Sequence, residues 1–145
     1  MTARLGQHQR ALLHDMRLYR GNYWERPRTV GGARRFTRDD WLLMRGLNIR
    51  GLTTSPYRYG MLTDEGCRVA DQIIAEVWGR DPLVVGDTIV LVIPDGPHHY
   101  GVRCGQHGVV SRGLTEGAAV LASGGHVADH RVALDKHAGC CGSAV

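Results

Sequence analysis

Two short Cys/His pairs are the residues of this sequence best suited to hold a metal ion. Cys104 and His107 are separated by two residues, and His137 and Cys140 repeat this gap after 29 further residues. Thiolate and imidazole ligands at such spacings are typical of structural zinc sites, where four ligands form a tetrahedron. We predict zinc at these four residues, against the alternative of unrelated polar side chains and a loose tail. Other side chains of the same types could replace members of the set: His126, His130 and Cys141.

Arginine side chains form a second group, and they are concentrated in one part of the chain. Residues 1–58 contain twelve Arg against four acidic residues, whereas residues 81–145 contain three Arg and one Lys against six acidic residues. A basic segment of this kind is typical of a surface that faces phosphates. The alternative is solvated surface arginine from codon bias, since Arg outnumbers Lys seventeen to one. The charge distribution favours nucleic acid as a partner.

The sequence has no pattern typical of an enzyme active site. It lacks a nucleophile elbow and a phosphate-binding glycine loop with a lysine. We therefore predict a binding protein and not an enzyme. No apolar run approaches the roughly 20 residues of a membrane span, and no export signal is visible. We expect a cytoplasmic protein without disulfides.

Local patterns predict three helices and a hairpin in the first part of the chain. The first helix is expected over residues 2–20, with an apolar side and its arginines, Arg17 included, elsewhere around it. Thr37 is a typical N-cap for a helix over 38–50, and Gly51 ends that helix. Short strands are expected at 52–54 and 57–62, and Thr63 caps a helix over 64–78 with a buried face at spacings of three and four.

The run RGLTTSPYRYGMLTDEGCRVA, residues 50–70, resembles a known family at this point. It is similar to the end of the recognition helix, the wing hairpin and the following helix of winged helix-turn-helix DNA-binding domains. The resemblance extends over about residues 10–79 and implies a winged-helix domain over residues 1–80. It also implies that the protein binds duplex DNA as a transcription regulator, a function that the fold alone does not fix.

The predicted DNA contacts lie on the helix over 38–50, the hairpin and the preceding loop. Arg and Asn are side chains that read bases, and arginines also hold phosphates. Asp39 and Asp40 argue against this use of the helix because they lie at the end that usually enters the major groove. Leu42 and Ile49 add an apolar outer face that suits a protein partner. The predicted DNA-binding residues are Arg34, Arg35, Arg45, Asn48, Arg50, Tyr57 and Arg58.

The periodicity changes from helix to strand after Gly79-Arg80-Asp81-Pro82. Short β-branched runs at 88–93, 109–110 and 118–121, separated by glycines, predict a small antiparallel barrel over residues 83–136, followed by a tail over 137–145. The segment from Gly86 to Val110 resembles the opening hairpin of an SH3-like barrel of the KOW type. The fold class is therefore α+β.

Two functions follow from these predictions. The first is a DNA-binding transcription regulator whose barrel offers a surface to a protein partner or to a second copy in a homodimer. The second is an adaptor that binds another protein, for example in a transcription complex, through Leu42, Ile49 and the barrel. Salt dependence of binding separates the two, because phosphate contacts weaken steeply with salt.

Overall fold

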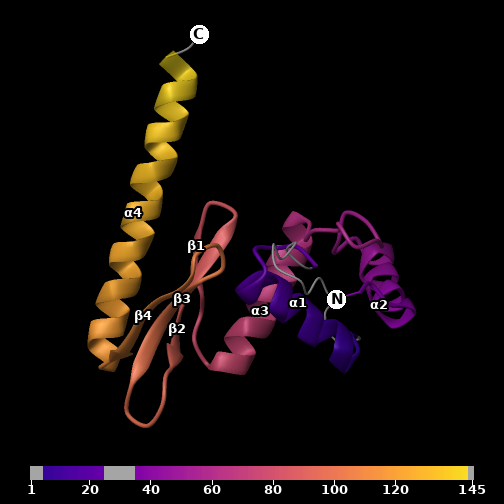
Figure 1. The fold of residues 1–145 in the computed structure, drawn as a ribbon, viewed down its shortest axis with the longest axis horizontal. Helices are drawn as coiled ribbons and strands as arrows, with labels where there is room; N and C mark the ends of the chain where they lie inside the picture. The colour runs from indigo at the N-terminus through magenta and orange to yellow at the C-terminus, as the bar shows by residue number, and fades with distance from the viewer. Residues whose placement is uncertain (1–4, 25–34, 144–145) are drawn as a thin grey trace. The chain divides into compact units, whose positions relative to one another are not determined.

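The computed structural model describes residues 5–24 and 35–143, with side chains through residue 134. Within these described residues, four helices and a four-stranded antiparallel sheet confirm the predicted α+β class (Figure 1). The chain divides into two compact units, Met1–Asp81 and Pro82–Val145. Among the described helices, none has the length and apolar character needed to cross a bilayer.

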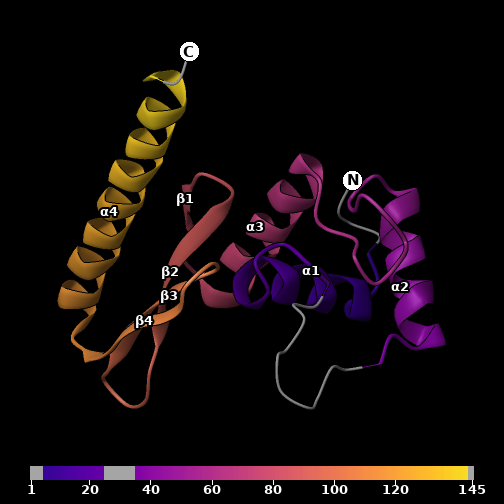
Figure 2. The ribbon, with the colours of Figure 1, turned by 45° about the horizontal axis from the view of Figure 1, so that its top comes forward.

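The part of unit 1 that the structure describes forms three helices, α1 (Gln7–Tyr19), α2 (Arg38–Ile49) and α3 (Asp64–Trp78). The Thr37 side chain accepts a hydrogen bond from the Asp40 backbone, and the Asp40 carboxylate accepts one from the Thr37 backbone, which closes a reciprocal cap on α2. Thr63 caps α3 in the predicted way through Gly66. The helix α1 packs against both α2 and α3 (Figure 2). The three predicted helices are therefore confirmed, with α1 shorter than expected.

The core of unit 1 is built from large apolar side chains of all three helices. Leu13, Met16, Met44 and Leu47 are fully buried, and Trp24 stacks its ring edge against Phe36 at a centroid distance of 4.9 Å. The segment between α2 and α3 folds back as expected, but it pairs through isolated bridges instead of full strands. The bridges join Thr53 with Leu62 and Tyr23 with Met61.

One arginine of unit 1 contradicts the sequence prediction. Arg17 was expected outside the apolar side of its helix, yet only 2% of it is exposed. Its guanidinium donates to both oxygens of Asp71, at 2.8 and 3.3 Å, and to Asn22 Oδ1 at 3.0 Å. A buried charge needs such partners, and Asp71 lies 54 residues away, so the partner was invisible in the local pattern.

Unit 2 begins with an antiparallel sheet in which neighbouring strands follow one another in sequence. Its strands are β1 (Leu83–Val85), β2 (Thr88–Pro94), β3 (Tyr100–Cys104) and β4 (Gly108–Leu114), in the spatial order β1-β2-β3-β4. Branched side chains supply most of its buried cluster: Val85, Val90, Val92 and Val102. Because β1 and β4 do not pair with each other, the sheet is open.

The predicted closed barrel is therefore wrong. Residues 118–121, expected as a strand, belong to α4 (Glu116–Ser143), which packs on the sheet and also takes in the predicted tail up to Ser143. The glycines at 117, 124 and 125, read as turn positions, lie inside this helix. Figure 1 shows α4 alongside the sheet, with its C-terminal part running past the strands. Tertiary contact with the sheet overrides the weak helix propensity of these glycines.

Small side chains line the surface that α4 turns toward the sheet. Ala119, Ser123 and Val127 are buried at spacings of four residues, and Ala122 packs against the same cluster. Such residues allow the helix to approach closely but bury little apolar area. His126 and His130 follow on the same side of the helix. A polar cluster therefore adjoins the residues through which α4 packs on the sheet.

Candidate metal centre and candidate nucleic-acid interface

The turn between β3 and β4 brings the first Cys/His pair together. Cys104 is the last residue of β3 and pairs with Gly108, the first residue of β4. Gly108 has a φ of 79°, a left-handed conformation that suits glycine in a short hairpin loop. His107 thus folds back over Cys104, whose sulfur lies 3.6 Å from His107 Nδ1. The predicted proximity of this pair is explained by a hairpin turn.

The helix α4 supplies the other two side chains. His126 and His130 are four residues apart and therefore lie on the same side of the helix, with ring centroids 4.7 Å apart. His130 Nε2 lies 3.4 Å from Cys104 Sγ, and His126 Nε2 lies 3.2 Å from His107 Nδ1. Each α4 histidine therefore contacts a residue of the β3–β4 hairpin.

The resulting cluster has the dimensions of a tetrahedral metal site. One ligand atom from each of Cys104, His107, His126 and His130 lies within 4.8 Å of all the others. With Zn–N bonds of about 2.05 Å and Zn–S bonds of about 2.3 Å, neighbouring tetrahedral ligands are about 3.3 to 3.6 Å apart. The three contacts described above fall between 3.2 and 3.6 Å. The four side chains could hold a metal ion with little movement.

The lowered pKa values of two of the histidines also favour metal binding. Burial lowers the pKa of His126, and the neighbouring His130 and His107 lower it further. Burial likewise lowers the pKa of His130, with His107 acting in the same direction, while Asp87 and Asp129 oppose the change. Both shifts favour the neutral form of the imidazole, which is the form that binds a metal.

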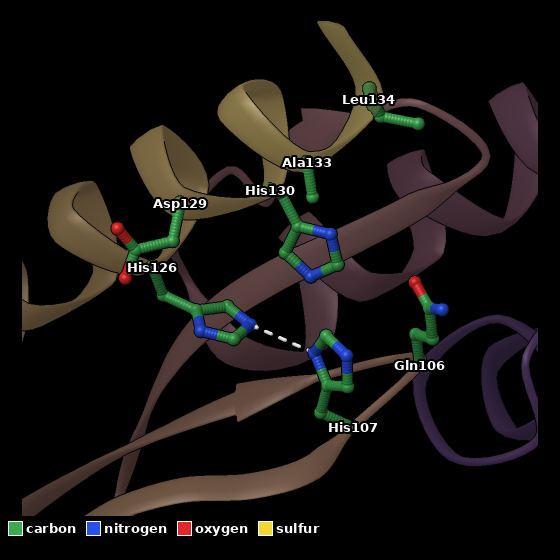
Figure 3. Close-up of a pocket in the computed structure, with 7 residues that line it drawn as sticks. All are labelled: Gln106, His107, His126, Asp129, His130, Ala133 and Leu134. Carbon is green, nitrogen blue, oxygen red and sulfur yellow. Dashed lines mark hydrogen bonds between the residues drawn. The ribbon is translucent and has the colours of Figure 1, made fainter. Parts of the chain in front are cut away.

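An open pocket gives access to the cluster from one side. It is lined by Gln106, Asp129, Ala133 and Leu134 in addition to the three histidines. Figure 3 shows the rings of His107, His126 and His130 turned toward one another between the hairpin and α4. Cys104 is fully buried beneath them and His107 is exposed. An ion could therefore enter from the side of the histidines and bind the Cys104 thiol last.

The structure places two of the four predicted zinc ligands in this cluster. Cys104 and His107 are there, whereas the side chains of His137 and Cys140 lie outside the described residues. His126 and His130, considered in the sequence only as substitutes, complete the set. Their spacing of four residues would have identified them if the segment had been recognised as a helix. The prediction of a strand nearby concealed that spacing.

On unit 1, two predicted DNA-binding arginines stand over aromatic rings. The guanidinium carbon of Arg45 lies 5.3 Å from the ring centre of Trp41 on α2, and that of Arg58 lies 5.5 Å from the ring centre of Tyr59 in the hairpin. Tyr57 and Tyr59 beside it are exposed, Tyr59 to 72%. Both arginines are exposed, so their N–H groups are available at the surface while each guanidinium stacks on its ring.

Other residues predicted to contact DNA have different surroundings. The Asn48 amide donates to the Thr53 backbone carbonyl at 2.9 Å and so ties α2 to the hairpin. Asp40, expected to repel phosphates, is 5% exposed and is engaged in the helix cap. Arg35 and Arg50 are exposed, and Arg34 lies outside the described residues. Leu42 and Ile49 are exposed as predicted, Ile49 to 72%.

Comparison with known proteins found no matching family model, no matching curated protein and no matching solved structure.

Proposed function

We propose that this protein binds one zinc ion through Cys104, His107, His126 and His130. The observation that carries the proposal is the spacing of the four ligand atoms, which all lie within 4.8 Å of one another. Nitrogen and sulfur donors suit zinc and not magnesium or calcium, which prefer oxygen ligands. Four protein ligands fill a tetrahedron, so the ion has a structural role and leaves no position for a substrate.

Elemental analysis of the purified chain tests this assignment. We expect about one zinc ion per chain, and a cobalt-loaded sample with the visible absorption of a tetrahedral site. Cys104→Ser and His130→Gln should each lose the ion. Matched controls outside the cluster, Cys67→Ser and His98→Gln, should retain it.

Two results would contradict the proposed ligand set. One is a wild-type chain that takes up no zinc or cobalt when the ions are supplied. The other is loss of the ion in His137→Gln and Cys140→Ser but not in His126→Gln and His130→Gln, which would restore the pairs first read from the sequence.

For unit 1, we propose binding to duplex DNA by a winged-helix domain, in a regulator of transcription. The observation that favours it is the exposed pair of stacked cations, Arg45 on Trp41 and Arg58 on Tyr59. Arg58 would contact the phosphate backbone or minor groove from the hairpin, and Arg45 would act from α2. Arg35 and Arg50 add positive charge, and the engaged Asn48 contributes by fixing the hairpin to α2.

A titration with random duplex DNA at two salt concentrations tests this second proposal. Arg58→Ala should weaken binding at low salt and reduce the slope of log affinity against log salt by about one. Arg112→Ala, an exposed arginine of β4, is the matched control and should bind as the wild type does. Absence of binding at low salt would favour the alternative, an adaptor that binds a protein through Leu42 and Ile49.

A further inference from the structure

The side chain of His14 in unit 1 lies between a donor on α3 and a carboxylate on α1. Trp78 Nε1–H donates to His14 Nε2 at 2.9 Å, and the two ring planes are inclined by 21°, which suits an in-plane hydrogen bond. His14 Nδ1 lies 2.9 Å from Asp15 Oδ1. Only 12% of the His14 side chain is exposed. Both ring nitrogens therefore have a protein partner and little access to water.

The chemistry of these partners fixes which nitrogen of His14 carries the proton. An indole nitrogen can donate a hydrogen bond but cannot accept one, so Nε2 must present its lone pair to Trp78. The proton then lies on Nδ1, which donates to Asp15 Oδ1. The opposite tautomer would place two N–H groups face to face. These contacts therefore require a neutral His14 with its proton on Nδ1.

Protonation of His14 affects its two contacts differently. In the imidazolium both nitrogens carry a proton, so Nδ1–H still donates to Asp15, and the opposite charges strengthen this contact. The proton added at Nε2 faces the N–H of Trp78 and removes that hydrogen bond. Because the ring is mostly buried, the new N–H cannot reach water unless Trp78 moves. The cost of charging His14 therefore falls on its contact with α3.

Two ion pairs link the same sides of α1 and α3 on either side of His14 along α1. They are Arg10 with Glu76 and Arg17 with Asp71. Arginine stays protonated and carboxylates ordinarily titrate near pH 4, whereas histidine ordinarily changes charge between about pH 5 and 8. The ring of Tyr19 meets His14 edge-on, with centroids 5.7 Å apart, and a phenol ordinarily ionises only near pH 10. Within the described residues, no charged group of α2 forms a hydrogen bond or ion pair with His14.

We propose that His14 and Trp78 form a pH-sensitive switch that holds the end of α3 to α1. Trp78 is the last residue of α3, and Gly79, with a φ of 66°, ends the helix as a left-handed cap. The chain passes into unit 2 shortly afterwards, at Pro82. Neutral His14 keeps this end of α3 attached to α1, and protonation of His14 releases Trp78. The inference requires neither the proposed zinc ion nor DNA binding.

The first test follows the Trp78 indole N–H and the His14 ring nitrogens by NMR in the full chain, from about pH 8 to about pH 5. At the upper end we expect the Nδ1–H form of His14 and a hydrogen-bonded indole. As the pH falls, the Trp78 signal should move in the same transition in which His14 gains its proton. Exchange of the indole proton with water, corrected for the intrinsic rate, should become about fivefold faster, the factor for losing one typical hydrogen bond.

Three variants separate this switch from a general effect of acid. His14→Gln offers an uncharged oxygen to Trp78 at every pH, so the Trp78 signal should no longer depend on pH. His8→Gln changes an exposed histidine of α1, is the matched control and should respond as the wild type does. Asp15→Asn keeps the Trp78 bond but removes the charge that favours the imidazolium, so the midpoint of the Trp78 transition should move to lower pH.

Three outcomes would overturn the assignment: an Nε2–H form of neutral His14, a Trp78 signal that does not change with pH in the wild type, or a Trp78 transition that remains in His14→Gln. If His14→Gln weakens the fold, Asp15→Asn still decides, because an unshifted midpoint in that variant contradicts the same proposal. Amide hydrogen exchange of α1 and α3 in each variant checks that both helices are intact.

Discussion

The two units of this protein fix their helices by different chemistry. In unit 1, large apolar side chains such as Trp24, Met16 and Leu47 fill the space between helices, and one internal ion pair, Arg17 with Asp71, is complete within the chain. In unit 2, the helix α4 meets the sheet through Ala119, Ser123 and Val127. Further along the helix, the contact includes a thiol and three imidazoles.

This difference leads to an expectation about which unit would depend on the proposed zinc ion. Burying a leucine-sized side chain stabilises a protein by roughly 1.5 to 3 kcal/mol, and an alanine contributes much less because it has less area to bury. Unit 1 therefore has the apolar contacts to hold its own helices. Unit 2 replaces such contacts at α4 with metal-binding side chains, so its stability should follow metal occupancy, as in other small metal-stabilised domains.

The largest expected effect is the loss of stability when the buried ion pair of unit 1 is broken. Asp71→Ala leaves the Arg17 guanidinium buried without its carboxylate and should destabilise the protein by about 3 kcal/mol. Chemical denaturation followed by tryptophan fluorescence measures the loss. The double variant Arg17→Met with Asp71→Leu removes both charges and should be distinctly more stable than Asp71→Ala. Equal stability of the two would show that the ion pair is not the cause.

The next effect concerns metal removal from unit 2. Zinc present at a hundred times its dissociation constant should stabilise the folded state by about 2.7 kcal/mol, which a chelator would remove. Amide hydrogen exchange should show this loss in β3, β4 and α4, while α1 to α3 keep their protection. Equal loss of protection in both units would contradict the contrast drawn here.

A smaller effect is expected from pH. A thiol releases its proton when it binds zinc, so zinc affinity should rise with pH. The lowered pKa values of His126 and His130 move the protonation of these rings to a pH below their ordinary value of 6.5. They should therefore add to the slope only at lower pH, where protonation competes with the metal. A slope already near three at neutral pH, measured by isothermal titration, would contradict this order.

The smallest effect compares the helix caps of the two units. Thr37 accepts from the backbone of Asp40 in α2, and Thr115 accepts from the backbone of Ala118 at the start of α4. Replacing either by alanine should cost about 1 kcal/mol. With zinc bound, Thr115→Ala should still cost this amount in thermal unfolding. Chelation should lower the melting temperature of the unit 2 transition in both variants and in the wild type. It should leave the unit 1 transition unchanged.

Short-range patterns in the sequence predict unit 1 well. Thr37 and Thr63 as caps, and the apolar spacing of the three helices, depend on neighbours within a few residues, which the sequence displays directly. The same reasoning fails for α4. Glycines at 117, 124 and 125 resemble turn positions, and only contact with the sheet makes the helix favourable there. The prediction of a barrel followed from that error.

The sequence by itself determined the donor types of the candidate metal centre, the pairing of Cys104 with His107, and the exposure of Leu42 and Ile49. Each of these follows from residue chemistry and from spacing along one element. Only the tertiary structure decided that His126 and His130 face that pair, that Arg17 is buried against Asp71, and that the sheet remains open. These outcomes depend on contacts between residues far apart in the chain. The free energy of such contacts cannot be predicted from a pattern of neighbouring residues.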